Sequence, residues 1–154
     1  MRASVTASLA AILVQLPLFA ALCLLPRMVM GGVDSDALVF YVAAVSIVAA
    51  ATVLLVGLPV FALLRGSGRM NAKTVALAGL SIGAFPVAVM GWPYHGLYSG
   101  YSSSGAWFGH AVDFYRNGSP TLYAWLDYLL CMARLGLQGM LGALVFYWVW
   151  RRLG

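Results

Sequence analysis

Four long apolar runs, separated by short clusters of charged residues, glycine or proline, take up most of this chain. They cover about residues 8–25, 37–64, 74–92 and 124–150. A bilayer core about 30 Å thick needs about 20 apolar residues in a helix, so each run is long enough to cross it. A membrane β-barrel would instead alternate apolar and polar residues in segments of about ten. The sequence therefore predicts an all-α integral membrane protein with four transmembrane helices in one domain, residues 1–154.

The composition favours a membrane-embedded chain and leaves little room for an extramembrane domain. Of the 154 residues, 63% are hydrophobic and 8% are charged, whereas a soluble domain has roughly 25% charged residues. This is too little polar surface to cover a water-soluble globule. Arg2 before the first run is also typical of a signal peptide, but no convincing small-x-small cleavage site follows. We therefore expect a retained first helix.

The charges between the runs predict how the helices are oriented. Most basic residues fall on the side that carries both termini: Arg2, Arg65, Arg69, Lys73, Arg151 and Arg152. Arg27 and Arg116 fall on the opposite side, together with three aspartates. Because basic residues accumulate on the cytoplasmic side of membranes, both termini are expected in the cytoplasm. The formal charge of +5 follows from this topology, so we expect contacts with the lipid bilayer and none with nucleic acid.

Three prolines lie inside the predicted helices: Pro17, Pro59 and Pro86. Each removes a backbone hydrogen bond and crowds the carbonyl four residues earlier, so each is expected to bend or locally open its helix. Membrane helices tolerate this where neighbouring helices or waters satisfy the freed carbonyls. The bends either shape the bundle or surround a small cavity through which a solute or a proton passes.

The fourth helix is predicted to be longer than the bilayer is thick. Asn117-Gly118 is typical of a turn, Ser119 of an N-cap and Pro120 of a first helical position. A helix from there to about Arg152 would extend about 50 Å at 1.5 Å per residue. It must therefore tilt, bend or project beyond the outer surface.

A polar stripe is predicted along one face of that helix. Asp127, Arg134 and Gln138 are spaced by seven and four residues, which places them on the same face, descending from the outer surface. At Arg134 a charged side chain costs at least about 2.5–3.5 kcal/mol unless it is paired or solvated. It can snorkel to the outer headgroups, pair with Asp127, line a pathway or meet an acidic residue of a partner. Gln15, near the middle of the first run, is a candidate neighbour.

Small residues on the same helix predict a close helix contact. They are Gly136, Gly139, Gly142 and Ala143. Gly139 and Ala143 match the small-xxx-small spacing of packed membrane helices. The contact is expected either within the chain or between subunits.

The outer loop of about residues 93–119 is rich in aromatic, glycine and serine residues. Amphipathic rings settle at membrane interfaces, so the segment from about Ser104 to Arg116 is predicted to form a short helix in the outer headgroup layer. Loops longer than about 12–15 residues are often functional. We therefore expect a contact surface for a partner or ligand at Tyr94, His95, Tyr98, Tyr101, Trp107, Phe108, His110 and Asp113.

The sequence holds no recognisable catalytic motif. There is no nucleophile elbow, HExxH motif, phosphate-binding glycine loop or pair of intramembrane carboxylates. His110 and Asp113 would face one way on a helix, which is compatible with a proton relay, a hydrogen bond or two metal ligands. Without a tighter motif we expect ordinary interfacial polar residues, with no catalytic residue, metal or cofactor. The chain is predicted not to be an enzyme.

Part of the second and third runs resembles a pattern in small bacterial inner-membrane proteins. The matching residues are Gly57-Leu58-Pro59 leading to Leu63-Leu64-Arg65, then Ala76-Leu77-Ala78-Gly79 and Gly83-Ala84-Phe85-Pro86. The resemblance implies a multi-pass protein of the bacterial cytoplasmic membrane and brings no particular activity with it.

Two hypotheses of function follow from these features. The first is a non-catalytic multi-pass membrane protein that acts through helix-helix and outer-loop contacts, as an accessory subunit of a membrane complex or an immunity-type interaction protein. Its partners would be other membrane protein subunits, either copies of itself or different chains. The alternative is a small oligomeric transporter or channel that uses the polar stripe of the fourth helix.

Overall fold

The computed structural model describes residues 2–24, 35–94 and 100–153 of the chain. Within these ranges, four helices are long and apolar enough to cross a membrane: Ala3–Leu22, Val42–Gly66, Ala72–Met90 and Leu122–Leu153. The prediction of four long apolar helices is therefore confirmed. Most helix boundaries lie within a few residues of the predicted runs, but the first helix already begins at Arg2. The fourth begins at Leu122, two residues after the start at Pro120 that the turn and cap residues predicted.

Two of the four helical segments contain a widened, π-helical turn. In chain order the helical elements are α1 (Arg2–Phe19), η1 (Ala20–Leu24), α3 (Ser35–Thr52), η2 (Val53–Gly57), α4 (Leu58–Gly66), α5 (Ala72–Met90) and α6 (Leu122–Leu153). The turn η1 directly continues α1, and η2 joins α3 to α4 without a break.

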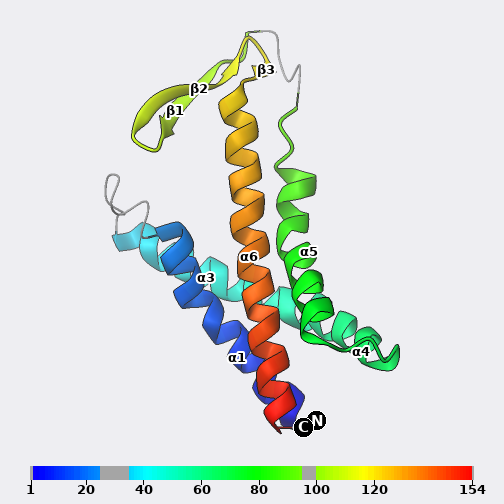
Figure 1. Ribbon diagram of the computed structural model, residues 1–154. Helices are drawn as coiled ribbons and strands as arrows, with labels where there is room; N and C mark the ends of the chain where they lie inside the picture. Colours follow the sequence, from blue (N-terminus) through cyan, green and yellow to red (C-terminus); the bar gives the residue numbers. More distant parts are fainter. Residues whose placement is uncertain (1, 25–34, 95–99, 154) are drawn as a thin grey trace.

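The helix α6 is the centre of the bundle (Figure 1). α5 packs along the half of α6 nearest the small sheet, and α1 packs along the half nearest the C-terminal end. The segment from α3 to α4 crosses the bundle and contacts both α1 and α5 through η2. It is the least buried of the four, with 6% of its most apolar window buried against 22% for α6.

The apolar core lies near the end of the bundle where α1 begins and α6 ends. Ala7 and Ala11 of α1 pack there with Phe61 of α4 and Phe146 of α6. The rings of Phe61 and Phe146 meet edge to face, with centroids 4.6 Å apart, and Trp150 packs edge to face on Phe61 at 5.2 Å. Such pairs contribute about 0.5–1.5 kcal/mol beyond their buried area. They fix α4 against the last turns of α6.

The start of α5 is determined by a capping box. The side chain of Asn71 accepts a hydrogen bond from the backbone N–H of Thr74 at 2.9 Å, and the Thr74 hydroxyl accepts one from the N–H of Asn71 at 3.3 Å. Two N–H groups that lack a partner within the helix are thereby satisfied. The third helix begins at Ala72 for this reason.

The three prolines have different surroundings. Pro59 lies two residues after the end of η2, and the N–H of Leu58 between them bonds to the carbonyl of Val53, five residues back. The widened turn gives room for the proline ring, which would otherwise crowd the carbonyl four residues earlier. Pro17 lies three residues before η1, whereas α5 continues as an α-helix past Pro86.

The segment predicted as an interfacial helix, about Ser104 to Arg116, is a β-hairpin instead, so that prediction is wrong. β1 (Ser103–Trp107) pairs antiparallel with β2 (His110–Arg116), and β2 pairs with β3 (Ser119–Pro120). The order in the sheet is β1-β2-β3. The fold is therefore mostly helical with a small sheet, rather than all-α.

Two tight turns explain the sheet. Phe108 (φ 49°) and Gly109 (φ 82°) link β1 to β2, and Asn117 (φ 51°) and Gly118 (φ 78°) link β2 to β3. Two central residues with positive φ form a type I′ turn, whose twist matches that of antiparallel strands, and Asn-Gly is its strongest sequence signal. Because Ser119 is paired in β3, the prediction that it caps α6 is also wrong.

Candidate functional site

Glycines bring the backbones of α5 and α6 into direct contact. A Cβ added to Gly79 would lie 2.5 Å from the Cβ of Ala143 and 2.6 Å from the carbonyl oxygen of Gly139. A Cβ added to Gly83 would overlap the carbonyl oxygen of Leu135. The spacing Gly79-xxx-Gly83 on α5 thus matches the small residues of α6. The sequence prediction named only the α6 side of this contact.

The remaining small residues of α6 lie against two different helices. Gly136 faces α5, where an added Cβ would lie 3.4 Å from both the carbonyl oxygen of Leu80 and the Cβ of Ala84. Gly142 faces α1, and a Cβ there would collide with the side-chain nitrogen of Gln15. Together the small residues let α6 approach α5 on one side and α1 on the other.

Two glutamines from different helices meet between α1 and α6. Gln15 is 8% exposed and Gln138 is 7% exposed. The side-chain nitrogen of Gln138 donates a long hydrogen bond, 3.5 Å, to the backbone carbonyl of Gln15. Its side-chain oxygen is buried and has no hydrogen-bond partner among the described residues. The side-chain amide of Gln15 likewise forms no hydrogen bond within the described part of the chain.

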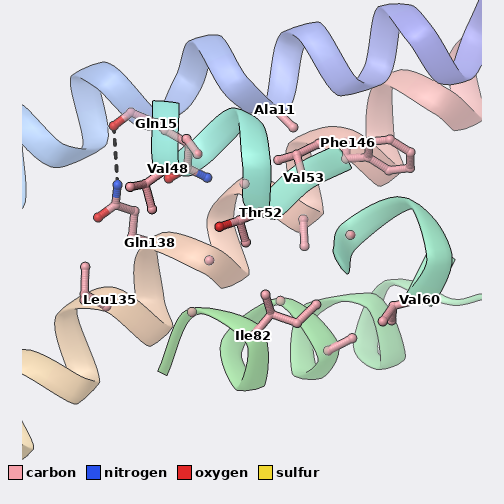
Figure 2. Close-up of a pocket in the computed structure, with 18 of the residues that line it drawn as sticks. Ala11, Gln15, Val48, Thr52, Val53, Val60, Ile82, Leu135, Gln138 and Phe146 are labelled. Carbon is pink, nitrogen blue, oxygen red and sulfur yellow. Dashed lines mark hydrogen bonds between the residues drawn. The ribbon is translucent and has the colours of Figure 1, made fainter. Parts of the chain in front are cut away.

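These glutamines line a cavity of about 370 Å³ to which all four helical segments contribute. Among the described residues that line it, none is charged, and the polar side chains are those of Gln15, Thr52 and Gln138. Figure 2 shows the Gln15 side chain directed from α1 among the lining residues, near Val48 and Val53. The turn η2 covers one side of the cavity, because Val53 and Gly57 are part of its wall.

The two charged residues of the predicted polar stripe do not line this cavity. Asp127 and Arg134 are half-buried on α6, and only Gln138 of the stripe reaches the cavity wall. Within the described ranges, the side chain of Arg134 forms no hydrogen bond or ion pair, and neither does that of Asp127. Gln15, the candidate neighbour of Arg134, contacts Gln138, which lies one turn further along α6.

Aromatic clusters mark two levels along α6. At one level Trp125 packs edge to face on Trp92, with centroids 5.2 Å apart, and Tyr128 packs on both rings. At the other level the Arg152 guanidinium lies 3.7 Å from the ring centroid of Trp148. Trp125 and Trp148 are 23 residues apart, or about 35 Å at 1.5 Å per residue. Arg134 lies nine residues from Trp125, or about 14 Å along the helix.

The hairpin is attached firmly to the first turn of α6. The Thr121 hydroxyl donates a hydrogen bond to the backbone carbonyl of Asp113 at 2.5 Å, and the Thr121 N–H donates one to the carbonyl of Phe114 at 2.9 Å. The Trp107 ring packs edge to face on Tyr123 of α6, with centroids 5.5 Å apart. The sheet therefore extends α6 as a defined structure rather than as a loose loop.

The expected contact surface of the outer loop is spread over this hairpin. Tyr101 and Phe108 are 45% and 49% exposed, and Tyr94 follows α5 at 53%. Trp107 is half-buried. His95 and Tyr98, which belong to the same prediction, lie outside the described residues.

His110 and Asp113 are not arranged as the helical interpretation required. Residues three apart on a strand point to opposite faces of the sheet, so these two side chains do not share a face. The Asp113 carboxylate instead accepts a hydrogen bond from the Arg116 guanidinium at 2.8 Å. Among the described residues, no group of three or more His, Cys, Asp or Glu side chains is placed to hold a metal ion.

A scan against protein-family models, a search of curated proteins and a search of solved structures each find no match to this chain. Its function is therefore inferred from its geometry. The free edge of the hairpin has no counterpart in the sequence prediction. A cavity is one of the two outcomes expected from the proline bends, but its position under η2 and its two glutamines are not predicted. The Asn117-Gly118 dipeptide is a local signal of a tight turn between strands, and it marks the turn from β2 to β3.

Proposed function

We propose that this chain is a non-catalytic multi-pass membrane protein that binds other membrane protein subunits, as an accessory subunit or an immunity-type interaction protein. In this proposal the four helices cross the bacterial cytoplasmic membrane and both termini are cytoplasmic. The observation that carries it is the unpaired charge of Arg134 in the middle of α6.

The depth of Arg134 makes a lone charge costly. Trp and Tyr side chains gather at membrane interfaces, so the cluster of Trp125, Trp92 and Tyr128 is expected at the outer interface. Arg134 then lies six residues below Tyr128 and nine below Trp125, or about 9–14 Å along the helix, which is further than an extended arginine side chain reaches. A charge at this depth costs at least about 2.5–3.5 kcal/mol on insertion scales. An acidic or hydrogen-bond-accepting side chain of a partner helix would offset that cost.

The exposed apolar helices offer room for such a partner. Arg134 is half-buried, so a neighbouring helix can reach its guanidinium. The adjacent Ala133 is exposed and small, which suits close helix packing. Contact with a second helix at this face needs no rearrangement of the described chain.

The hairpin supplies a second contact surface outside the bilayer. β1 is an edge strand, and its residues Ser-Ser-Gly-Ala-Trp carry no charge or proline that would prevent pairing with another strand. Phe108 at the tip is held at φ 49°, a conformation that costs about 1–2 kcal/mol for residues with a Cβ. Strained positions cluster at functional sites, so the exposed Phe108 ring supports a contact role for the tip.

The transport alternative has weaker support. Its pathway would use Asp127, Arg134 and Gln138 together, yet only Gln138 lines the cavity. A charged pathway through the cavity would therefore require a different arrangement of α6.

The test measures two properties of the same variants: the stability of the chain and its ability to form a complex. In Arg134→Leu the charge is lost but no bond within the described chain is broken. We expect the unfolding midpoint of the purified protein in detergent to stay the same or rise, while co-purification of its partner from native membranes falls at least tenfold. Arg134→Lys, which keeps the charge, is the matched control and should retain most of the partner.

The opposite pattern would contradict this proposal. If Arg134→Leu destabilises the isolated chain and leaves co-purification unchanged, then Arg134 supports the fold itself. If the parent chain, expressed at its native level, purifies as a monomer without any partner, then the interaction function is wrong.

A further inference from the structure

The cavity under η2 contains a polar group that the fold itself does not use. Gln15 is 8% exposed and lines the cavity, and its side-chain amide forms no hydrogen bond within the described part of the chain. Figure 2 shows it among apolar side chains of α3, η2 and α6. Leaving a buried amide without partners is unfavourable, so a bound molecule that satisfies it gains affinity and specificity.

Gly142 has no side chain and therefore leaves room for this amide. A Cβ on Gly142 would collide with the amide nitrogen of Gln15. The hydrogen bond from Gln138 goes to the backbone carbonyl of Gln15, so it fixes the main chain and leaves the side-chain amide available. The Thr52 hydroxyl on the cavity wall also forms no hydrogen bond within the described residues.

The size and lining of the cavity limit what can enter it. Its volume of about 370 Å³ lies at the lower end of the roughly 300–1,000 Å³ of small-molecule pockets and exceeds the roughly 150 Å³ cavity that binds benzene. No described residue of the lining is charged, so a charged ligand would be buried without a counter-ion. The occupant must therefore be mostly apolar and uncharged.

The depth of the cavity points to a ligand that enters from the lipid. Gln138 lies near the middle of the 32-residue helix α6, about 23 Å from either end at 1.5 Å per residue. A phospholipid headgroup stays at the interface and does not reach this level. A hydroxyl group both donates and accepts hydrogen bonds, as the free amide of Gln15 does.

We propose that this cavity binds an uncharged, lipid-soluble alcohol or phenol, whose hydroxyl pairs with the Gln15 side-chain amide while its hydrocarbon part fills the apolar wall. This site is distinct from the partner surfaces at Arg134 and the hairpin, so each inference is tested separately. The ligand enters laterally, past the loosely packed segment of α3 and η2.

The probe is a photoreactive hexadecanol carrying a diazirine, added to the full chain in lipid nanodiscs. We expect labelling of peptides from α3, η2 and α6 that line the cavity. Unlabelled hexadecanol should compete with the probe about fivefold to tenfold better than hexadecane. This ratio corresponds to the free energy of one hydrogen bond. Hexadecyl methyl ether, which accepts but does not donate, should fall between them.

Gln15→Leu is the decisive variant, because it keeps the volume of the side chain and removes only the amide. This variant should still be labelled at the cavity, but hexadecanol and hexadecane should compete equally well with the probe. Ala49→Phe, which places a ring in the cavity wall, should abolish labelling there without affecting Gln15. Gly142→Ala should displace the amide and resemble Gln15→Leu.

Three results would overturn the proposal. Labelling spread over the exposed outer face of α3 would show ordinary lipid contact instead of a site. An unchanged preference for the alcohol in Gln15→Leu would show that the amide is not the recognition group. Cavity labelling that persists in Ala49→Phe would show that the probe binds elsewhere.

Discussion

Gly139 is the residue at which the fit between α5 and α6 is closest. A Cβ there would overlap the carbonyl oxygen of Gly79 and lie 3.0 Å from the Cα of Gly83. Both opposing atoms belong to the backbone, so neither can move aside as a flexible side chain would. Even one methyl group at this position must separate the two helices.

Gly139→Ala is therefore expected to destabilise the protein, although alanine is the better helix former. Overpacking of this kind typically costs about 1–3 kcal/mol. Gly66→Ala is the matched control, because Gly66 is also helical and an added Cβ meets nothing within 4 Å. Reversible unfolding in mixed detergent micelles measures both variants. Equal stability of the two would show that α5 and α6 are not in close contact.

The hairpin is expected to bind a strand of a partner along its free edge, β1. In a hairpin with a two-residue turn, Trp107 and His110 exchange hydrogen bonds, and the next pair along, Ala106 and Ala111, does not. The N–H and carbonyl of Ala106 therefore point away from β2, toward the free edge. Addition of a partner strand uses such groups.

Ala106→Pro removes this outward N–H and spares the ladder between β1 and β2. Edge strands tolerate proline at such positions, so the hairpin should still form while partner binding falls at least tenfold. Ala106→Ser retains the N–H and is the control, and Ala106→Lys tests whether an edge charge has the same effect. Hydrogen exchange of the β2 amides checks the hairpin, and co-purification measures binding. Full binding by Ala106→Pro with an intact hairpin would exclude strand addition.

The sequence predicts the helices of this fold better than it predicts the hairpin beside them or the contacts between them. Apolar length and flanking charge are local properties, so the four helices follow from them directly. The hairpin does not follow from the sequence, because the aromatic residues of the outer loop favour an interfacial helix and nothing marks Phe108 as a turn residue. Asn117-Gly118 indicates only the turn between β2 and β3. The contact between Gln15 and Gln138 joins residues 123 positions apart, and no local pattern specifies such a pairing. The same holds for the cavity, which depends on how η2 crosses the bundle.

Charged residues mark the two opposite ends of the whole molecule. Arg65 of α4 lies over the ring of Trp150 on α6, 5.6 Å from its centroid, so the end of α4 and the last turns of α6 share one level. The hairpin, with the Asp113 and Arg116 pair, lies at the opposite end (Figure 1). In the proposed orientation the basic end faces the cytoplasm.

This orientation predicts which positions a membrane-impermeant maleimide reaches in intact cells. With Cys23 and Cys131 replaced by alanine, Ser104→Cys in the hairpin should be labelled, and Ser67→Cys between α4 and α5 should react only after the cells are permeabilised. Both positions are exposed, so burial does not confound the comparison. Labelling in the reverse order would invert the proposed topology.

In the proposed function, a second protein contacts α6 beside Arg134 within the membrane. The most direct measurement is site-specific photo-crosslinking in intact membranes, with a photoreactive amino acid in place of Ala133 and, as a control, in place of Leu77 on the exposed face of α5. We predict a discrete protein adduct from position 133 that disappears when Arg134→Leu is added, and none from position 77. Adducts with lipid alone at position 133, or a protein adduct that persists in Arg134→Leu, would show that Arg134 does not bind a partner protein.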